Sequence, residues 1–81
     1  MKLPRDVSGH ELAKSLGKFG YQVTRQTGSH IRLTSTFKIR EHHITIPRQN
    51  PLKIGTLAGI LSEVASYLKM EKEDLSEILF K

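Results

Sequence analysis

The chain has 81 residues, of which 37% are hydrophobic and 26% are charged, so we expect one small folded domain over residues 1–81 rather than two domains or a disordered segment. It contains no cysteine, which excludes disulfide bonds and thiolate metal sites. Thirteen Lys and Arg residues against eight Asp and Glu residues give a formal charge of +5, and such a positive field favours polyanions, nucleic acids first among them.

The start of the chain, MKLPRDVSG, has no apolar run of signal-peptide length, and the longest apolar run elsewhere is too short to cross a membrane. We therefore expect a cytoplasmic protein without a membrane partner. The absence of cysteine agrees with a reducing compartment but does not establish one.

The first predicted element is a helix from about Ser8 to Phe19. Ser8 followed three residues later by Glu11 forms a capping box, a signature of a helix start. Apolar residues then recur at helical spacing, namely Leu12, Ala13, Leu16 and Phe19. Gly20 is placed to end this helix.

Three amphipathic strands are predicted next, because the hydrophobic period changes to two. The apolar positions are Tyr21 and Val23 in the first strand, Ile31 and Leu33 in the second, and Ile44 and Ile46 in the third. Gly28 and Ser29 join the first two strands, and a glycine at the first central position favours a type II′ hairpin turn. The connection from Ser35 to Glu41 is longer and basic, because it carries Lys38 and Arg40.

A second helix is predicted from about Thr56, a residue type that often caps helices. Its apolar positions at helical spacing are Leu57, Ile60, Leu61, Val64 and Leu68. A short final helix follows, with Leu75, Ile78 and Leu79 among acidic neighbours.

The predicted order is helix, three antiparallel strands, helix and short C-terminal helix, which is an α+β fold with both main helices on one face of the sheet. The other face of the sheet then stays open. By alternation, its residues are Gln22, Thr24, Gln26, His30, Arg32, Thr34, His43 and Thr45.

His30 is the candidate for chemistry on this open face. An exposed imidazole beside Arg32 could act as a general acid or base, because its ordinary pKa of about 6.5 lies near neutrality. Histidine is also acceptable as an inert residue on a solvated strand, and the pattern alone favours that interpretation without excluding a catalytic one.

Cations and acidic residues occupy different parts of the chain. The strands and adjoining loops carry Arg25, Arg32, Lys38, Arg40, Arg48 and Lys53, whereas the last helix carries Glu71, Glu73, Asp74 and Glu77. This asymmetry predicts a basic face for phosphates, although a merely solvated face explains it as well. Gly55 and Thr56, with Lys53 beside them, could offer backbone N–H groups to a phosphate, or Thr56 could simply cap the helix.

No metal site or cofactor is predicted. His42 and His43 are adjacent in a strand, so their side chains point to opposite faces and cannot easily chelate one ion. His10 has no recognisable partner. The sequence also lacks a glycine-rich phosphate loop, a serine nucleophile elbow and a pair of acidic residues at catalytic spacing.

Three short motifs, in this order and spacing, resemble the HicA (YcfA-like) toxins of toxin-antitoxin systems. They are G-S-H at residues 28–30, H-I-T-I-P at residues 43–47 and G-T-L-x-x-I-L at residues 55–61. The similarity runs from about Ser8 to Leu68.

This resemblance implies a fold like the double-stranded-RNA-binding domain and an mRNA interferase activity that a HicB-type antitoxin neutralises. The histidine of the G-S-H motif is regarded as catalytic in that family, and by motif match it is His30. The predicted RNA contacts are Ser29, Arg32, Lys38, Arg40 and Arg48. One departure is visible: many relatives have a histidine two residues after the proline that ends the third strand, where this chain has Gln49.

Two other functions compete with the toxin hypothesis. A non-enzymatic RNA-binding module would use the same face without chemistry, and Gln49 slightly favours it. A protein-interaction domain would have no affinity for RNA.

Overall fold

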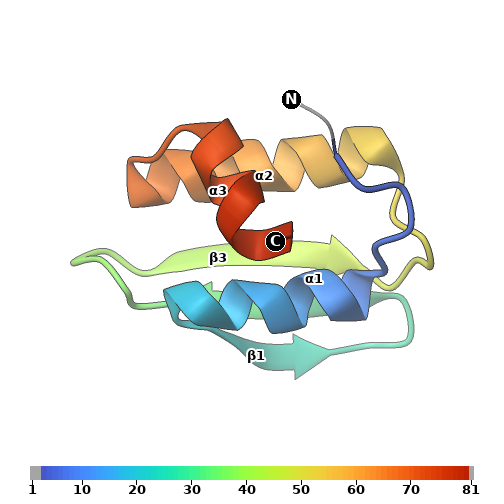
Figure 1. The fold of residues 1–81 in the computed structure, drawn as a ribbon. Coiled ribbons are helices and arrows are strands. Elements are labelled where there is room, and N and C mark those ends of the chain that lie inside the picture. Colours follow the sequence, from blue (N-terminus) through green and yellow to red (C-terminus); the bar gives the residue numbers. More distant parts are fainter. Residues whose placement is uncertain (1–2, 81) are drawn as a thin grey trace.

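A three-stranded antiparallel sheet and three α-helices make up the computed structural model of the protein, which describes residues 3–80 (Figure 1). The elements in chain order are α1 (Gly9–Leu16), the 3-10 turn η1 (Gly17–Phe19), β1 (Tyr21–Gln26), β2 (His30–Ser35), β3 (His42–Pro47), α2 (Ile54–Leu68) and α3 (Lys72–Phe80). This order confirms the predicted α+β fold of the double-stranded-RNA-binding-domain type with an added C-terminal helix.

The start of α1 follows the predicted capping box. The Ser8 hydroxyl accepts the backbone N–H of Glu11, and the Glu11 carboxylate accepts the backbone N–H of Ser8, both at 3.1 Å. The helix tightens into η1 and ends at Gly20, whose φ of 79° is the left-handed conformation that glycine adopts without strain.

The sheet has the order β1-β2-β3, and a β-bulge interrupts the pairing of β1. Val23 pairs with Leu33 and Arg25 pairs with Arg32, so Thr24 is the extra residue. Directly opposed residues share a face of the sheet, so the bulge moves Arg25 to the open face and Gln26 to the other. The prediction for Gln26 was therefore wrong, because simple alternation does not anticipate an inserted residue. Val23, expected to be buried, is 49% exposed.

The hairpin between β1 and β2 is not the predicted type II′ turn. Gly20 is the one glycine with a positive φ among residues 3–80, whereas type II′ requires a positive φ at Gly28. The side chain of Thr27 closes the turn instead. Its hydroxyl accepts the backbone N–H groups of Ser29 (3.3 Å) and His30 (3.1 Å).

Helix α2 begins at Ile54, two residues before the predicted start. Its N-cap is Lys53, which has an extended backbone and makes no side-chain cap hydrogen bond. Thr56 lies inside the first turn, so the prediction that it caps the helix was wrong.

The core lies between the sheet and the helices. Helix α1 contacts all three strands, α2 contacts β3, and α3 contacts both α1 and α2, as the red helix in Figure 1 shows. The largest fully buried apolar side chains come from β2, β3 and all three α-helices. They are Leu12, Leu16, Ile31, Leu33, Ile46, Leu57, Leu61, Val64 and Leu75. Among the described helices, none has the length and apolar character that a membrane span requires.

Candidate functional site

The face of the sheet that the helices leave open carries the predicted site. Along β2, Ile31, Leu33 and Ser35 are buried, whereas His30 and Arg32 are exposed. The predicted exposure of His30 is therefore confirmed. The alternation that buries one face of β2 sets the direction of this side chain.

His30 stands at the hairpin end of the sheet, where its backbone is fixed. Its carbonyl accepts the Thr27 N–H at 2.9 Å, and its own N–H donates to the Thr27 hydroxyl. The Nδ1 atom of the ring lies 2.9 Å from the Ser29 hydroxyl. Within residues 3–80, Nε2 of His30 makes no hydrogen bond, so this nitrogen is free to meet a substrate.

Arg32 lies two residues along β2 from His30, and the bulge places Arg25 directly opposite it. Both guanidinium groups belong to exposed residues on the open face. Like charges that face each other across a strand pair are unfavourable, and an anion between them would relieve the repulsion. Strict alternation would have put Arg25 on the core side, and an arginine there was the signal that β1 contains a bulge.

Arg48 is held against the turn that carries His30. Its backbone N–H donates to the Ser29 carbonyl at 2.8 Å, and its Nη1 donates to the Thr27 carbonyl at 2.9 Å. The structure thus brings Ser29, His30 and Arg48 together, with Arg32 on the same face.

Lys38 and Arg40 lie in the loop beyond the opposite end of β2. Because a strand rises about 3.3 Å per residue, roughly 17 Å of β2 separates His30 from the start of this loop. These two predicted RNA contacts are therefore not part of the His30 cluster. The hydroxyl of Tyr67 fixes their loop, because it accepts the Lys38 N–H at 2.9 Å and donates to the Arg40 carbonyl at 2.5 Å.

The two adjacent histidines of β3 point to opposite faces, as predicted. On the open face, Nδ1 of His43 lies 2.8 Å from the Thr34 hydroxyl, which in turn lies 3.2 Å from the Thr24 hydroxyl. This row of hydrogen bonds connects side chains of all three strands, and it occupies the Nδ1 atom of His43.

On the other face, His42 stacks on Tyr67 with ring centroids 4.7 Å apart. The Nδ1 atom of His42 lies 2.5 Å from the Tyr21 hydroxyl. Burial raises the pKa of Tyr21, so this hydroxyl keeps its proton and can donate it to a neutral imidazole. Burial also lowers the pKa of His42, which favours that neutral form.

The remaining polar candidates lie apart from this site. His10 is exposed on α1. No group of three or more metal-ligating side chains occurs in residues 3–80. The side-chain oxygen of Gln49 is buried and has no hydrogen-bond partner in the described part of the chain.

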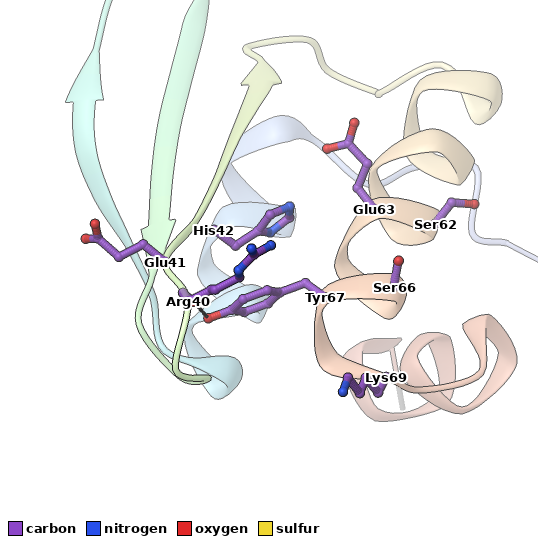
Figure 2. Close-up of a pocket in the computed structure, with 8 residues that line it drawn as sticks. All are labelled: Arg40, Glu41, His42, Ser62, Glu63, Ser66, Tyr67 and Lys69. Atoms are coloured by element: carbon purple, nitrogen blue, oxygen red, sulfur yellow. Dashed lines mark hydrogen bonds between the residues drawn. The ribbon is translucent and has the colours of Figure 1, made fainter.

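A second surface feature is a groove of about 640 Å³ between β3 and α2 (Figure 2). The rings of His42 and Tyr67 lie across it, and Glu41 points away from α2. The other lining residues are Arg40, Ser62, Glu63, Ser66 and Lys69.

The comparison with protein families gives a match. A family model described as the HicA toxin of bacterial toxin-antitoxin systems matches residues 9–65, the segment from the first residue of α1 to Ala65 in α2. The match includes the whole sheet and both ends of the hairpin turn that carries His30. No curated protein and no solved structure matches.

Proposed function

The chain belongs to the HicA toxin family of bacterial toxin-antitoxin systems, whose model covers well over half of its residues, and from that premise we propose that it is an endoribonuclease that cleaves messenger RNA. The observation that carries the proposal is the exposed His30 ring, whose Nε2 is free and whose face of the sheet also holds Arg25 and Arg32.

The proposed reaction uses the nucleophile that RNA itself contains. The 2′-oxygen attacks the adjacent phosphorus, its proton leaves, the bond from phosphorus to the 5′-oxygen breaks, and that oxygen takes up a proton. His30 performs one of these proton transfers as general acid or base, and water performs the other. A positioned acid or base typically contributes about 10² to 10⁴ in rate.

The two arginines would act on the charge of the reacting phosphate. Negative charge accumulates on the phosphorane oxygens, and cations placed beforehand stabilise it without reorganisation. Arg25 and Arg32 face each other near His30, so a phosphate between them would also remove their mutual repulsion. Lys38 and Arg40 would contact phosphates further along the RNA, because their loop lies at the other end of the sheet.

Membership of a toxin-antitoxin family implies an antitoxin partner. We expect this antitoxin to be of the HicB type and to inhibit by covering the open face, in the cytoplasm where messenger RNA is translated. Binding would then protect His30 and exclude RNA at the same time.

The test is cleavage of a labelled RNA by the purified protein in excess EDTA. We expect products with 2′,3′-cyclic phosphate ends, and no cleavage when every 2′-OH is methylated, because the methyl group removes the nucleophile. Cleavage of the methylated RNA would show that the 2′-oxygen does not attack. Cleavage that disappears in EDTA and returns with one particular metal would contradict the histidine mechanism.

An RNA-binding module without catalysis is the second candidate. It is favoured by Gln49, which stands where the resemblance to the HicA toxins leads us to expect a histidine. In the same assay such a module would retain the RNA on a filter and leave it intact.

A further inference from the structure

Within the sheet of residues 3–80, β3 is an edge strand, so the main-chain groups on its outer side do not pair with another strand. The Arg48 N–H donates to the Ser29 carbonyl, which makes these two residues a hydrogen-bonded pair. Such pairs alternate along an antiparallel ladder. Ile46 and Ile44 therefore direct their main-chain groups toward β2, whereas Thr45 and His43 direct theirs outward.

In the described part of the chain, no main-chain hydrogen bond outside the β2–β3 ladder reaches the N–H or C=O groups of His43 and Thr45. An unpaired edge of this kind is a template for an added strand.

The groove between the edge of β3 and α2 has two parts, which share the lining residue Glu63. One part, of about 450 Å³, is lined by residues 43–45 of β3 and by Gly55, Thr56, Gly59, Ile60 and Glu63 of α2. The other part shares Glu63 and continues past His42 and Tyr67 (Figure 2). The space above Gly55 and Gly59 is empty, since a Cβ atom at either position would have no neighbour within 4 Å. An extended chain can thus approach the outer edge of β3 without meeting a side chain at these two positions.

The opposite edge of the sheet is less suited to pairing. β1 is interrupted at Thr24 by its bulge, and bulges are a common means of protecting an edge from added strands. β3 pairs with β2 without interruption over all six of its residues, so its outer edge is regular.

We propose that an extended, net acidic segment of the antitoxin adds as a fourth strand to the edge of β3. This inference rests on the membership of a toxin-antitoxin family that underlies the proposed function. The chain's charge of +5 disfavours a second copy of itself as the occupant and favours an acidic segment. Arg40 and Lys69 line one end of the groove, where Glu41 is directed away from α2, and Glu63 lies where the two parts of the groove meet (Figure 2). An acidic segment would therefore place its carboxylates at the end that carries Arg40 and Lys69.

The geometry also specifies the pattern of the added strand. Its side chains alternate between the two faces of the sheet. One set faces the groove, where Gly55 and Gly59 leave room for apolar side chains. The other set continues the open face beside His43 and Thr45. A partner held in this way is separated from β2, the strand that carries His30, by β3 alone, so the rest of the partner is in position to cover the open face.

The test uses a phage library of random linear peptides of about eight residues, the length of an ordinary strand. The library is selected on the intact protein, and selected peptides are measured against three variants. In Gly59→Gln a side chain enters the groove. In Thr45→Pro the outward N–H is lost while the ladder to β2 keeps its bonds. Gly17→Gln is the control, since Gly17 is exposed at the end of α1 and a Cβ there meets nothing within 4 Å.

We expect the selected peptides to be acidic with alternating apolar residues. Both groove variants should weaken their binding at least tenfold, whereas Gly17→Gln should leave it unchanged. Amide hydrogen exchange should slow at His43 and Thr45 when peptide binds, and stay as it was at Val23 of β1. Circular dichroism on each variant shows whether weaker binding comes from the changed groove or from a protein that has not folded.

Three results would overturn the proposal. They are a selection that yields no binding peptide, equal binding to the parent and to both groove variants, and a dimer in sedimentation that Gly59→Gln dissociates, which would make a second copy the occupant. RNA cleavage is measured separately. A protein that cleaves RNA without binding such peptides refutes only this inference, and the reverse result refutes only the ribonuclease.

Discussion

The Nδ1 atom of His30 lies 2.9 Å from the hydroxyl oxygen of Ser29, the residue that precedes it in the hairpin turn. Either atom can carry the proton, depending on the tautomer of the ring. In both cases Nδ1 is engaged and Nε2 faces solvent. The backbone of both residues is bonded to Thr27, so the imidazole is oriented by the turn.

The first prediction concerns His30→Ala. The side chain is exposed on the open face, so its truncation leaves no cavity, and the free energy of unfolding should change by no more than about 0.5 kcal/mol. If the ring transfers a proton, RNA cleavage should fall by roughly two to four orders of magnitude while RNA affinity stays nearly constant. Cleavage kinetics, filter binding and urea denaturation measure the three quantities.

His43→Ala and His10→Ala are the controls for this variant. His43 shares the open face but its Nδ1 bonds to Thr34, and His10 is exposed on α1. Neither should lower cleavage by more than a few-fold. A His30 variant as active as its parent would remove the catalytic residue from the ribonuclease proposal and favour the RNA-binding module.

The second prediction separates positioning from proton transfer. Ser29→Ala removes the hydroxyl that orients the His30 ring, but it leaves both nitrogens. We expect cleavage to fall about fivefold, which corresponds to the loss of one ordinary hydrogen bond of roughly 1 kcal/mol. The double variant Ser29→Ala/His30→Ala should cleave no more slowly than His30→Ala alone, because the Ser29 hydroxyl acts through the ring. If Ser29 acted only by stabilising the turn, its loss would lower the residual rate of His30→Ala further.

Much of this fold follows from local sequence signals. The capping box at Ser8, the left-handed Gly20 and the alternation in β2 and β3 each act within a few residues, and each is present as predicted. The bulge at Thr24 was not predicted, because an inserted residue depends on the pairing of β1 with β2. The start of α2 was predicted two residues too late. The N-cap residue Lys53 makes no side-chain cap hydrogen bond, so the sequence contains no capping signal at the true start.

The candidate site was predictable in part for the same reason. Alternation places His30 and Arg32 on one face, and this pattern is local. Arg25 joins them only through the bulge, and Arg48 is drawn to the turn by its bond to the Thr27 carbonyl. Lys38 and Arg40 have suitable charges, but their distance from His30 depends on the length of β2 and on the bond of their loop to Tyr67.

The third prediction tests the basic face. If Arg25 and Arg32 contact phosphates, replacing either with Ala should reduce the slope of log affinity against log salt by about 0.7, the value for one contact to a single strand. Lys14→Ala, on an exposed position of α1, should leave the slope unchanged. The measurement is RNA binding at a series of salt concentrations. Equal slopes for all variants would show that the RNA, if bound, lies elsewhere.

The fourth prediction concerns the dependence of stability on pH. Burial lowers the pKa of His42, Glu63 acts in the opposite direction, and His43 adds to the lowering. The unfolded chain therefore binds a proton at this residue more readily than the folded chain. As the pH falls through the ordinary histidine pKa of about 6.5, folding stability should decrease. The decrease should level off once the pH is below the pKa of His42 in the folded chain.

His42→Phe tests this assignment, because the phenyl ring keeps an aromatic contact with Tyr67 but has no proton to bind. Its stability should be lower at every pH, since the bond to Tyr21 is lost, but should decline less between about pH 7.5 and about pH 5. Urea midpoints at each pH provide the measurement. His10→Ala should decline like the parent. A decline in His42→Phe as steep as in the parent would assign the effect to another group.

The fifth prediction compares two helical glycines with opposite surroundings. A Cβ atom at Gly9 would overlap the backbone carbonyl of Pro47, whereas a Cβ at Gly59 would meet nothing within 4 Å. The N–H of Gly9 also donates to the Gln49 carbonyl at 2.9 Å, so the start of α1 is attached to the chain after β3 and cannot withdraw. Gly9→Ala should therefore destabilise the fold by about 1–3 kcal/mol, as overpacking does. Gly59→Ala should stabilise it by about 0.5–1 kcal/mol, because glycine is a poor helix former. Urea unfolding of both variants gives the two signs, and a Gly9→Ala protein as stable as its parent would mean that α1 can move away from β3.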